Sequence, residues 1–247
     1  MDESDVKPAL FLSDLHLSEA RPKAAAAFLA FAAGPARSAS AVYILGDLFD
    51  RWFGDDQLAE PFVAAITQAL RGVSDAGIPL YVGHGNRDFL LGREFARVTG
   101  ANLLPETQVL DLFGVRTLLC HGDELCTDDV AYQRYRRRVR NPALQRRLLR
   151  LPYWGRRALA SWLRRMSRDE NSLKAEAIMD VNARAVEDVF RTHSVQRMIH
   201  GHTHRPARHV HDVDGTARER WVLSDWHDRG QYLAVDETGV HVREIAG

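Results

Sequence analysis

The stretch ALFLSDLH at residues 9–16 places four apolar residues directly before a short polar cluster that contains an aspartate and a histidine. A short apolar run of this kind predicts a buried strand, and the polar residues after it fall on the loop beyond the strand end. The same order recurs in GDLFD at 46–50, HGNRD at 84–88, HGD at 121–123 and GHTH at 201–204. Because α/β sheets place their chemistry on loops at strand ends, we expect the five clusters to form one site along an edge of the fold.

The five clusters supply seven candidate metal ligands. These are Asp14, His16, Asp47, Asn86, His121, His202 and His204. Mixed oxygen and nitrogen donors without a thiolate suit divalent ions such as Mn²⁺, Zn²⁺ or Fe²⁺. Asp14 and His16 are one residue apart, so both point to the same side of an extended backbone, and the histidines of GHTH repeat this arrangement. Two ions roughly 3.5 to 4 Å apart need a shared carboxylate, for which we choose Asp47.

Each motif alone has a plainer explanation. An Asp-x-His pair in a loop is usually a turn or a cap, and Gly-Asp and Gly-Asn dipeptides are typical of turns. Two histidines on one extended face, as in GHTH, have fewer structural reasons to be there. The joint order of all five motifs after strand-like runs is what favours a two-metal phosphoesterase site over five unrelated turns.

The motifs resemble those of the calcineurin-like metallophosphoesterase superfamily, D-x-H, G-D-x-x-[DE], G-N-H-[DE], a histidine after a strand, and G-H-x-H. The resemblance spans residues 9–225. It implies one ion held by Asp14, His16, Asp47 and His204, and a second held by Asp47, Asn86, His121 and His202. It also implies a layered αββα sandwich, and the alternation of helix and strand patterns predicts the same α/β class.

One position departs from the superfamily pattern: Arg87 follows the asparagine where a histidine is common. An arginine cannot give up its proton at ordinary pH, so it cannot act as a general acid towards a leaving alkoxide. It can still neutralise charge on a phosphoryl oxygen. A leaving phosphate monoester, with a second pKa of about 6, needs no proton at neutral pH. We therefore expect Arg87 to be catalytic and the cleaved bond to be a phosphoanhydride.

The composition indicates one catalytic domain that does not span a membrane. The chain has 247 residues, of which 45% are apolar, enough to bury a substantial core. Its apolar runs stay far below the roughly 18 residues of a spanning helix, and the start MDESD is acidic where a signal peptide is basic. We expect a cytoplasmic protein. Cys120 and Cys126 make no disulfide framework, and we expect packing roles for both.

Hydrophobic periodicity predicts regular elements on both sides of an arginine-rich insertion. The expected strands lie near 9–12, 41–45, 78–82, 108–113, 115–120, 195–200, 208–213, 219–224, 231–236 and 239–245, and the expected helices near 20–33, 57–72, 92–99 and 172–191. We divide the chain into a first core part at 1–127, a helical lid insertion at 128–172 and a second core part at 173–247.

The insertion is strongly basic and amphipathic. Residues 131–168 hold thirteen arginines and no acidic residue, although the whole chain has a net charge of zero. Asn141 and Pro142 predict a helix start, and leucines follow at 144, 148 and 151 until Pro152. A second stripe, Leu159, Trp162, Leu163 and Met166, predicts another short helix.

Three roles for this insertion can be compared from the residues. It could be a solvated helical cap, a nucleic-acid surface, or a cover for lipid chains whose arginines face anionic head groups. Few aromatic residues suited to stacking and a pI of about 7.2 argue against nucleic acid. The residues alone leave the other two roles open.

The motif variants resemble one branch of the superfamily, which hydrolyses UDP-2,3-diacylglucosamine in bacterial lipid A synthesis. The matching segments are GNRDFLLG at 85–92, HGDELCTDD at 121–129, AIMDVN at 177–182 and IHGHTHRP at 199–206. This resemblance implies Mn²⁺ as cofactor, UMP and 2,3-diacylglucosamine 1-phosphate (lipid X) as products, and peripheral attachment to the cytoplasmic face of the inner membrane. It implies neither nucleic acid nor an obligate protein partner. The implied substrate contacts are Asn86, Arg87, Asp129, Tyr132, Arg164, Ser167, Asn171, Lys174 and His202.

Alternatives remain for several of these residues. From the residues alone, Ser167 indicates a helix N-cap, Asn171 a loop and Lys174 a solvated charge. The other histidines are expected to be structural: His84, His193, His200, His209, His211, His227 and His241. His84 and His200 flank motifs and could orient ligands, as could Asp123 and Asp129. The alternative functions are a metal-dependent phosphodiesterase or nuclease of the same superfamily, and a metal-free scaffold of the same fold.

Overall fold

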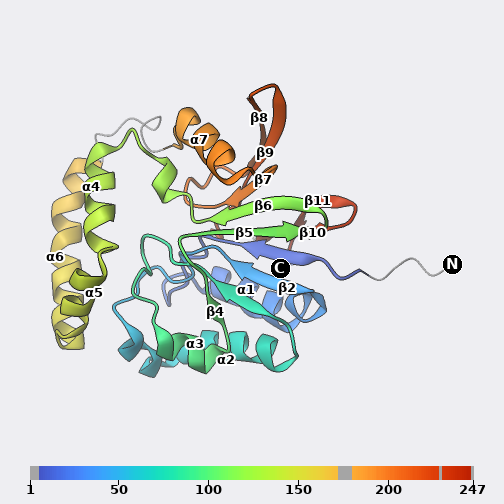
Figure 1. Ribbon diagram of the computed structural model, residues 1–247. Coiled ribbons are helices and arrows are strands. Elements are labelled where there is room, and N and C mark those ends of the chain that lie inside the picture. The colour runs from blue at the N-terminus through green and yellow to red at the C-terminus, as the bar shows by residue number, and fades with distance from the viewer. Residues whose placement is uncertain (1–5, 172–179, 228–229, 246–247) are drawn as a thin grey trace.

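The computed structural model describes residues 6–171, 180–227 and 230–245, which form two mixed sheets with helices outside them (Figure 1). The six-stranded sheet has the order β11-β10-β1-β2-β3-β4, with strands β1 Ala9–Leu12, β2 Ala41–Ile44, β3 Leu80–Val82, β4 Asn102–Leu103, β10 Gln231–Asp236 and β11 Gly239–Glu244. The five-stranded sheet has the order β5-β6-β7-β9-β8, with strands β5 Thr107–Leu112, β6 Val115–Cys120, β7 Arg197–His200, β8 Ala207–Val213 and β9 Thr216–Val222.

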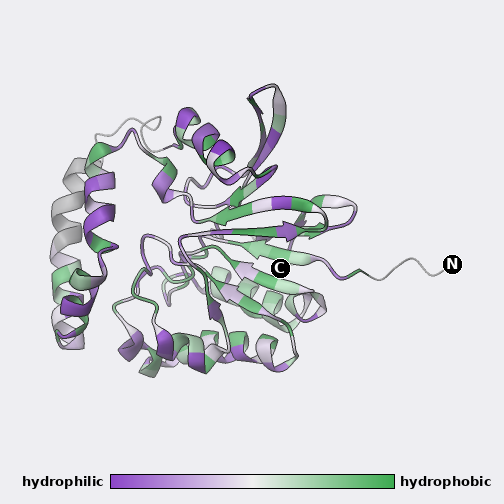
Figure 2. Cartoon of the chain, in the orientation of Figure 1, coloured by the Kyte–Doolittle hydropathy of each residue, from purple (hydrophilic) through white to green (hydrophobic). Residues whose placement is uncertain are grey.

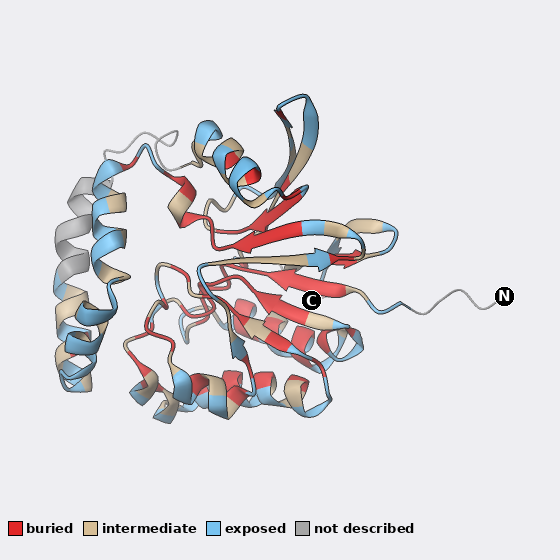
Figure 3. Cartoon of the chain, viewed as in Figure 1, coloured by how far each residue is buried: buried red, intermediate tan, exposed pale blue. Residues whose placement is uncertain are grey.

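Strand β1 lies inside the six-stranded sheet and is buried on both faces (Figure 3). It pairs in parallel with β2 and antiparallel with β10. Leu10 and Leu12 belong to the core beneath the helices, whereas Phe11 belongs to the core between the two sheets. In that second core the ring of Phe11 stacks on Tyr43, with centroids 4.8 Å apart. Burial on both faces explains why the stretch is apolar throughout instead of alternating.

Helices cover the outer face of each sheet. The helical elements of the sandwich are α1 Pro22–Ala33, α2 Pro61–Asp75, α3 Arg93–Thr99 and α7 Ala183–His193, with short 3-10 turns η1 Pro35–Ser38, η2 Asp55–Ala59 and η3 Asp123–Leu125. Helices α1, α2 and α3 share a core with the six-stranded sheet. Val186 and Phe190 of α7 pack with Leu118 and Met198 of the five-stranded sheet. The expected αββα sandwich is therefore confirmed.

Three further helices lie beside the sandwich (Figure 1). They are α4 Val130–Val139, α5 Pro142–Leu149 and α6 Tyr153–Asn171. Asn141 caps α5, since its side chain accepts hydrogen bonds from the backbone of Ala143 and Leu144, as the sequence predicted. Figure 2 shows hydrophilic and hydrophobic residues mixed along α4 and α5. No helix in the described part of the chain is long and apolar enough to cross a membrane.

The start of α6 is fixed to the sandwich by a buried arginine. Arg156 is only 5% exposed, and its Nη1 donates to the backbone oxygen of Phe53 at 2.6 Å while its Nη2 pairs with Asp56. A Cβ at Gly54, whose φ is +118°, would lie 2.2 Å from that Nη1. Glycine is therefore required at this position so that the guanidinium can reach the loop.

Some expected boundaries were wrong. The helix expected near 172–191 begins at Ala183, because the side chain of Asn182 accepts a hydrogen bond from the backbone of Ala185 and caps it. Residues 172–179 lie outside the described part of the chain. The helix expected near 57–72 begins at Pro61, since residues before it form η2, and the two-residue strand β4 was not predicted. Both cysteines are buried and neither forms a disulfide in the described part of the chain, in agreement with their expected packing role.

Arg156→Met should loosen the start of α6. The variant loses two charge-assisted hydrogen bonds, each worth about 1.5 to 3 kcal/mol, so amide hydrogen exchange of residues 153–161 should accelerate by about 100-fold or more. Exchange in the two sheets should not change. Arg157→Met is the matched control, because the neighbouring Arg157 is 58% exposed and its ion pair is long, with Nη1 3.9 Å from Glu60 Oε1. Equal exchange rates of residues 153–161 in both variants would show that Arg156 does not anchor α6.

Candidate metal centre

The structure brings all seven candidate ligands to one end of the sandwich, each from a loop that follows a strand. Asp14 and His16 follow β1, Asp47 follows β2 and Asn86 follows β3. His121 directly follows β6, and the GHTH histidines follow β7. Each cluster thus lies on a loop beyond a strand, as the sequence predicted, and strand ends of both sheets contribute.

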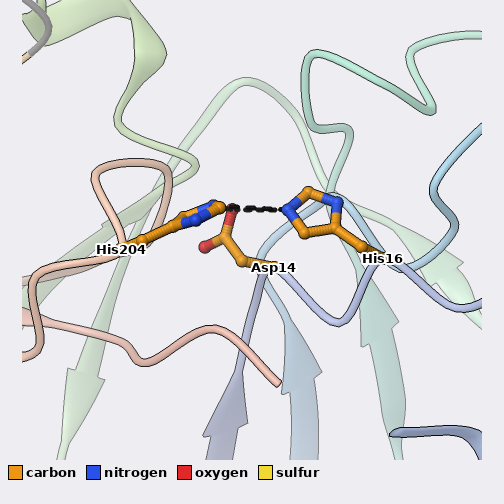
Figure 4. Close-up of side chains that lie close together, drawn as sticks. All are labelled: Asp14, His16 and His204. Carbon is orange, nitrogen blue, oxygen red and sulfur yellow. Dashed lines mark hydrogen bonds and ion pairs between the residues drawn. The ribbon is translucent and has the colours of Figure 1, made fainter. Parts of the chain in front are cut away.

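The first group of ligands surrounds Asp14 (Figure 4). His204 Nε2 lies 3.3 Å from Asp14 Oδ1 and 3.3 Å from His16 Nε2. His16 Nε2 lies 4.0 Å from the same carboxylate oxygen. One carboxylate oxygen and two imidazole nitrogens thus converge on a single point.

The second group surrounds Asn86. Its Oδ1 lies 3.1 Å from His121 Nε2 and 3.1 Å from His202 Nδ1. Asp47 lies between the groups, since its Oδ2 is 3.9 Å from His121 Nε2 and 3.7 Å from His16 Nδ1. The Asp47 carboxylate therefore lies near one histidine of each group.

These side chains fit a metal centre better than a closed hydrogen-bond network. Asp14 Oδ1 and His16 Nδ1 are both buried, and neither has a hydrogen-bond partner in the described part of the chain. A buried polar group without a partner is costly, and a cation beside each of these two atoms would satisfy it. The oxygen and nitrogen donors suit a divalent ion of the first transition row.

The backbone at this site is unusual. Five of the seven candidate ligands have positive φ angles: Asp14 (56°), His16 (48°), Asp47 (53°), His202 (70°) and His204 (54°). Only a few per cent of non-glycine residues adopt this conformation, and such strain is concentrated at functional sites. Asp and His tolerate it better than most residues. The structure therefore holds the ligands at a conformational cost.

The glycines of the motifs allow the loops to approach closely. A Cβ at Gly85 would lie 2.0 Å from Asp47 Oδ1, and a Cβ at Gly201 would lie 2.2 Å from Asp14 Oδ2. No other residue fits either position. The G-N and G-H dipeptides are thus explained by contact with a carboxylate of another loop and not only by turn geometry.

Residues 7–206 match the calcineurin-like phosphoesterase family. The chain belongs to this family. A protein of Aromatoleum aromaticum named UDP-2,3-diacylglucosamine hydrolase is 52% identical over 231 residues, which cover 94% of each chain. Proteins of the same name from Edwardsiella ictaluri and Escherichia coli O81 are 50% and 48% identical, and the matches cover 96% and 94% of this chain and 91% and 97% of theirs. Among solved structures, TT1561 of Thermus thermophilus is similar with a TM-score of 0.49 at 11% identity, over 98% of this chain and 100% of that one.

Arg87 takes the place of the common phosphoesterase histidine at the rim of the centre. Its Nη1 donates to Asp50 Oδ1 at 2.7 Å, and its Nε lies 3.8 Å from Asp47 Oδ2. Its backbone N–H donates to Asp47 Oδ1 at 2.8 Å. The side chain is 43% exposed, so a fixed positive charge faces the open side of the site.

The structure describes the side chains of some of the other expected substrate contacts, but not of all. The Tyr132 ring stacks on His202 at 5.8 Å between centroids, and its hydroxyl donates to Asp123 Oδ2 at 2.9 Å. Asp129 caps α4 by accepting from the backbone of Tyr132. Arg164, Ser167 and Asn171 lie on α6 with side chains outside the described part of the chain, as is the whole of Lys174. Ser167 is thus inside a helix and not at its N-cap, and Asn171 ends that helix and does not lie in a loop.

Sequence reasoning missed three residues that hold this phosphoesterase site together. Asp88 is fully buried and accepts hydrogen bonds from the backbone of Asp47, Leu48 and Gly85, so it ties two motif loops to each other. Its place at the end of the G-N-R-D motif was the available signal. Arg140, which directly follows α4, donates to the backbone oxygens of residues 84 and 85. Asp225 Oδ2 lies 3.6 Å from His204 Nδ1. Neither had a signal in the sequence.

Electrostatics separate the histidines into two kinds. Burial, with Arg87 adding to it, lowers the pKa of His16 to about 3, and burial with His121 lowers the pKa of His202 to about 4. Both are neutral imidazoles at neutral pH, the form that binds metal. Burial raises the pKa of Asp47 to about 7. Burial opposes protonation of His121, but the carboxylates of Asp47 and Asp14 raise its pKa to about 9.

Metal binding to the metal-free chain should therefore release about one proton at pH 7, from the pair of Asp47 and His121. Since the pKa of His121 is raised, the affinity for Mn²⁺ should increase as the pH rises from 7 to about 9 and then level off. Isothermal titration calorimetry in buffers of different ionisation enthalpy measures the proton count. In His121→Asn the release should persist and come from Asp47, because loss of the imidazolium raises the pKa of that carboxyl further. A binding enthalpy that does not depend on the buffer, with equal Mn²⁺ affinity at pH 7 and 9, would contradict the predicted proton release.

Proposed function

We propose that this protein hydrolyses the pyrophosphate bond of UDP-2,3-diacylglucosamine to UMP and 2,3-diacylglucosamine 1-phosphate, a step of lipid A synthesis. The observation that carries the proposal is a fixed arginine, Arg87, beside the candidate bridging carboxylate at the position where the motif commonly has histidine. Relatives named for hydrolysis of this substrate match nearly the whole chain, which supports the choice.

Two divalent ions would occupy the candidate centre, and we propose Mn²⁺. Asp14, His16, Asp47 and His204 would hold one ion, and Asp47, Asn86, His121 and His202 the other. When bound, such ions act as Lewis acids on phosphoryl oxygens and lower the pKa of water towards about 7. The chain's own part is to hold the imidazoles and the buried carboxylates in place before the ions arrive.

Arg87 would stabilise the charge that develops on the phosphoryl oxygens during in-line attack by water. Its guanidinium is held by Asp50, so its direction is fixed before the substrate binds. Neither a protein nucleophile nor a protein acid is required, because both products are phosphate monoesters with a second pKa of about 6. An alkyl phosphodiester would lack this advantage, which is why the arginine favours an anhydride.

Helices α4–α6 would cover the glucosamine and its acyl chains. The stacking of Tyr132 on His202 places α4 next to the metal centre. Leu144, Leu148 and Leu159 are partly buried and would contact the acyl chains. The proposed polar contacts to the substrate are Asn86, Arg87, Asp129, Tyr132, Arg164, Ser167, Asn171, Lys174 and His202.

We further propose peripheral association with the cytoplasmic face of the inner membrane through these helices. Trp154 is 74% exposed and Trp162 is 51% exposed, both on α6. Arg150 and Arg157, which lie within four residues of Trp154 in the chain, are also exposed. Large exposed aromatic side chains next to basic ones are typical of surfaces that bind anionic lipid head groups.

The substrate class can be tested by varying the acyl chains. Each buried methylene contributes about 0.8 kcal/mol, so removing four of them should weaken kcat/KM about 200-fold if the chains are fully enclosed. Release of UMP in the presence of Mn²⁺ is the measurement, with Asp47→Asn as the inactive control. A nuclease or a general phosphodiesterase should instead cleave single-stranded DNA or bis-p-nitrophenyl phosphate. Equal kcat/KM for UDP-glucosamine with and without acyl chains would exclude the lipid substrate.

Arg87→Ala should lower kcat about 100-fold without loss of metal binding, because it removes charge stabilisation from the transition state. Arg87→His should not restore full activity, since the proposal requires charge and not a proton donor. Arg51→Ala is the matched control: Arg51 also pairs with Asp50, at 3.2 Å, and is 49% exposed. Full activity of Arg87→His, with a new acidic limb in its pH profile, would refute the assigned role.

A further inference from the structure

Arg220, on strand β9 of the five-stranded sheet, is an arginine buried without a carboxylate. The residue is 6% exposed, and burial lowers its pKa. Its Nε donates to His211 Nε2 at 3.2 Å, and its Nη1 lies 3.1 Å from His200 Nε2. Within the described ranges no carboxylate forms an ion pair with it. A buried guanidinium that is always charged normally has an anion beside it.

A cavity of about 210 Å³ opens in front of this arginine. It is lined by Asp180, Thr203, Arg205, His209 and Arg220, with apolar walls from three further residues. His209 lies directly opposite Arg220 in the β8–β9 ladder, so both side chains stand on the same face of the sheet. At about 30 Å³ for each water in the liquid, this space has room for a small oxyanion and several waters.

Of the charged groups around the cavity that the structure describes, Arg220 is the one without an ion pair. Arg205 Nη1 pairs with Asp180 Oδ2 at 2.8 Å, so these two charges offset each other. Burial, with Arg220 adding to it, lowers the pKa of both His209 and His211, so both rings are neutral at neutral pH. Thr203 Oγ1 is buried and has no hydrogen-bond partner in the described part of the chain. The cavity is therefore lined by a guanidinium that makes no ion pair among the described residues, by one imidazole, and by a threonine whose buried hydroxyl makes no hydrogen bond there. The Asp180 carboxylate is paired with Arg205, although its charge also raises the pKa of Arg220.

We propose that this cavity is an anion-binding site for a phosphate group, formed by Arg220, His209 and Thr203. A tetrahedral oxyanion accepts hydrogen bonds from a guanidinium, a hydroxyl and an imidazole at once. The site is separate from the candidate metal centre but adjoins it, because Thr203 stands between His202 and His204 in the chain. Those two histidines contact Asn86 and Asp14, whereas Thr203 lines the cavity. The assignment goes beyond the proposed hydrolysis and does not depend on it.

Calorimetric titration of the full-length chain with inorganic phosphate tests the site. Metal ions are first removed with a chelator, so that phosphate cannot bind to them. Wild type should bind one phosphate, and Arg220→Gln should bind it at least about tenfold more weakly. Arg208→Gln is the matched control, since Arg208 lies on the same hairpin but pairs with Glu219 and the ring of Trp221. It should bind phosphate like wild type.

If Arg220→Gln does not fold, His209→Ala provides the test, because His209 lies on the exposed hairpin and its replacement should not prevent folding. His209→Ala should bind phosphate about fivefold more weakly than wild type. UMP and uridine identify the source of the phosphate group. Equal affinity for phosphate and UMP assigns free phosphate, and tighter binding of UMP assigns a nucleotide. No saturable binding by wild type, equal binding by wild type and His209→Ala, or equal binding of UMP and uridine would overturn the proposal.

Discussion

Two carboxylates buried among imidazoles are the constraint on which the rest of the structure depends. Asp14 and Asp47 are at most 1% exposed, and an ionised carboxylate without nearby compensation is very costly in a protein interior. Compensation comes from histidines on loops that follow β1, β6 and β7, so strands of both sheets must end at the same place. The sandwich provides this, and Gly85 and Gly201 provide the close approach between loops. The fold and the site are thus two consequences of one electrostatic requirement.

Much of this arrangement could be predicted because its signals are local. The stretch at 9–12 is a strand because four consecutive apolar residues are buried on both faces, and no distant contact is needed to recognise it. Asn141 and Pro142 mark the start of α5 for an equally local reason, a side chain that caps its own helix. The convergence of the five motif loops was predictable from the rule that parallel strands carry polar residues beyond their ends.

The failures all involve partners that are distant in sequence or a choice between two local signals. Asp88 accepts a hydrogen bond from the backbone of Leu48, 40 residues away, and its place at the end of the G-N-R-D motif does not indicate which groups it binds. Arg220 has the sequence context of an ordinary exposed strand residue, yet tertiary packing around the β8–β9 ladder buries it. At Asn182 the apolar periodicity favoured a continuing helix, whereas the capping hydrogen bond to Ala185 made it the helix start. Tertiary contacts and caps override periodicity in such cases.

The positive φ angles at five candidate ligands have a consequence for how this sequence can change over time. Each such conformation costs about 1 kcal/mol or more in a non-glycine residue, which is appreciable beside the roughly 5 to 15 kcal/mol that holds a typical domain together. A chain freed from selection for metal binding would gain stability by accepting glycine at Asp14, Asp47 or His202. The ligands are therefore retained at a cost in stability. A descendant that no longer binds metal should first accept substitutions at these positive-φ positions, before its core residues change.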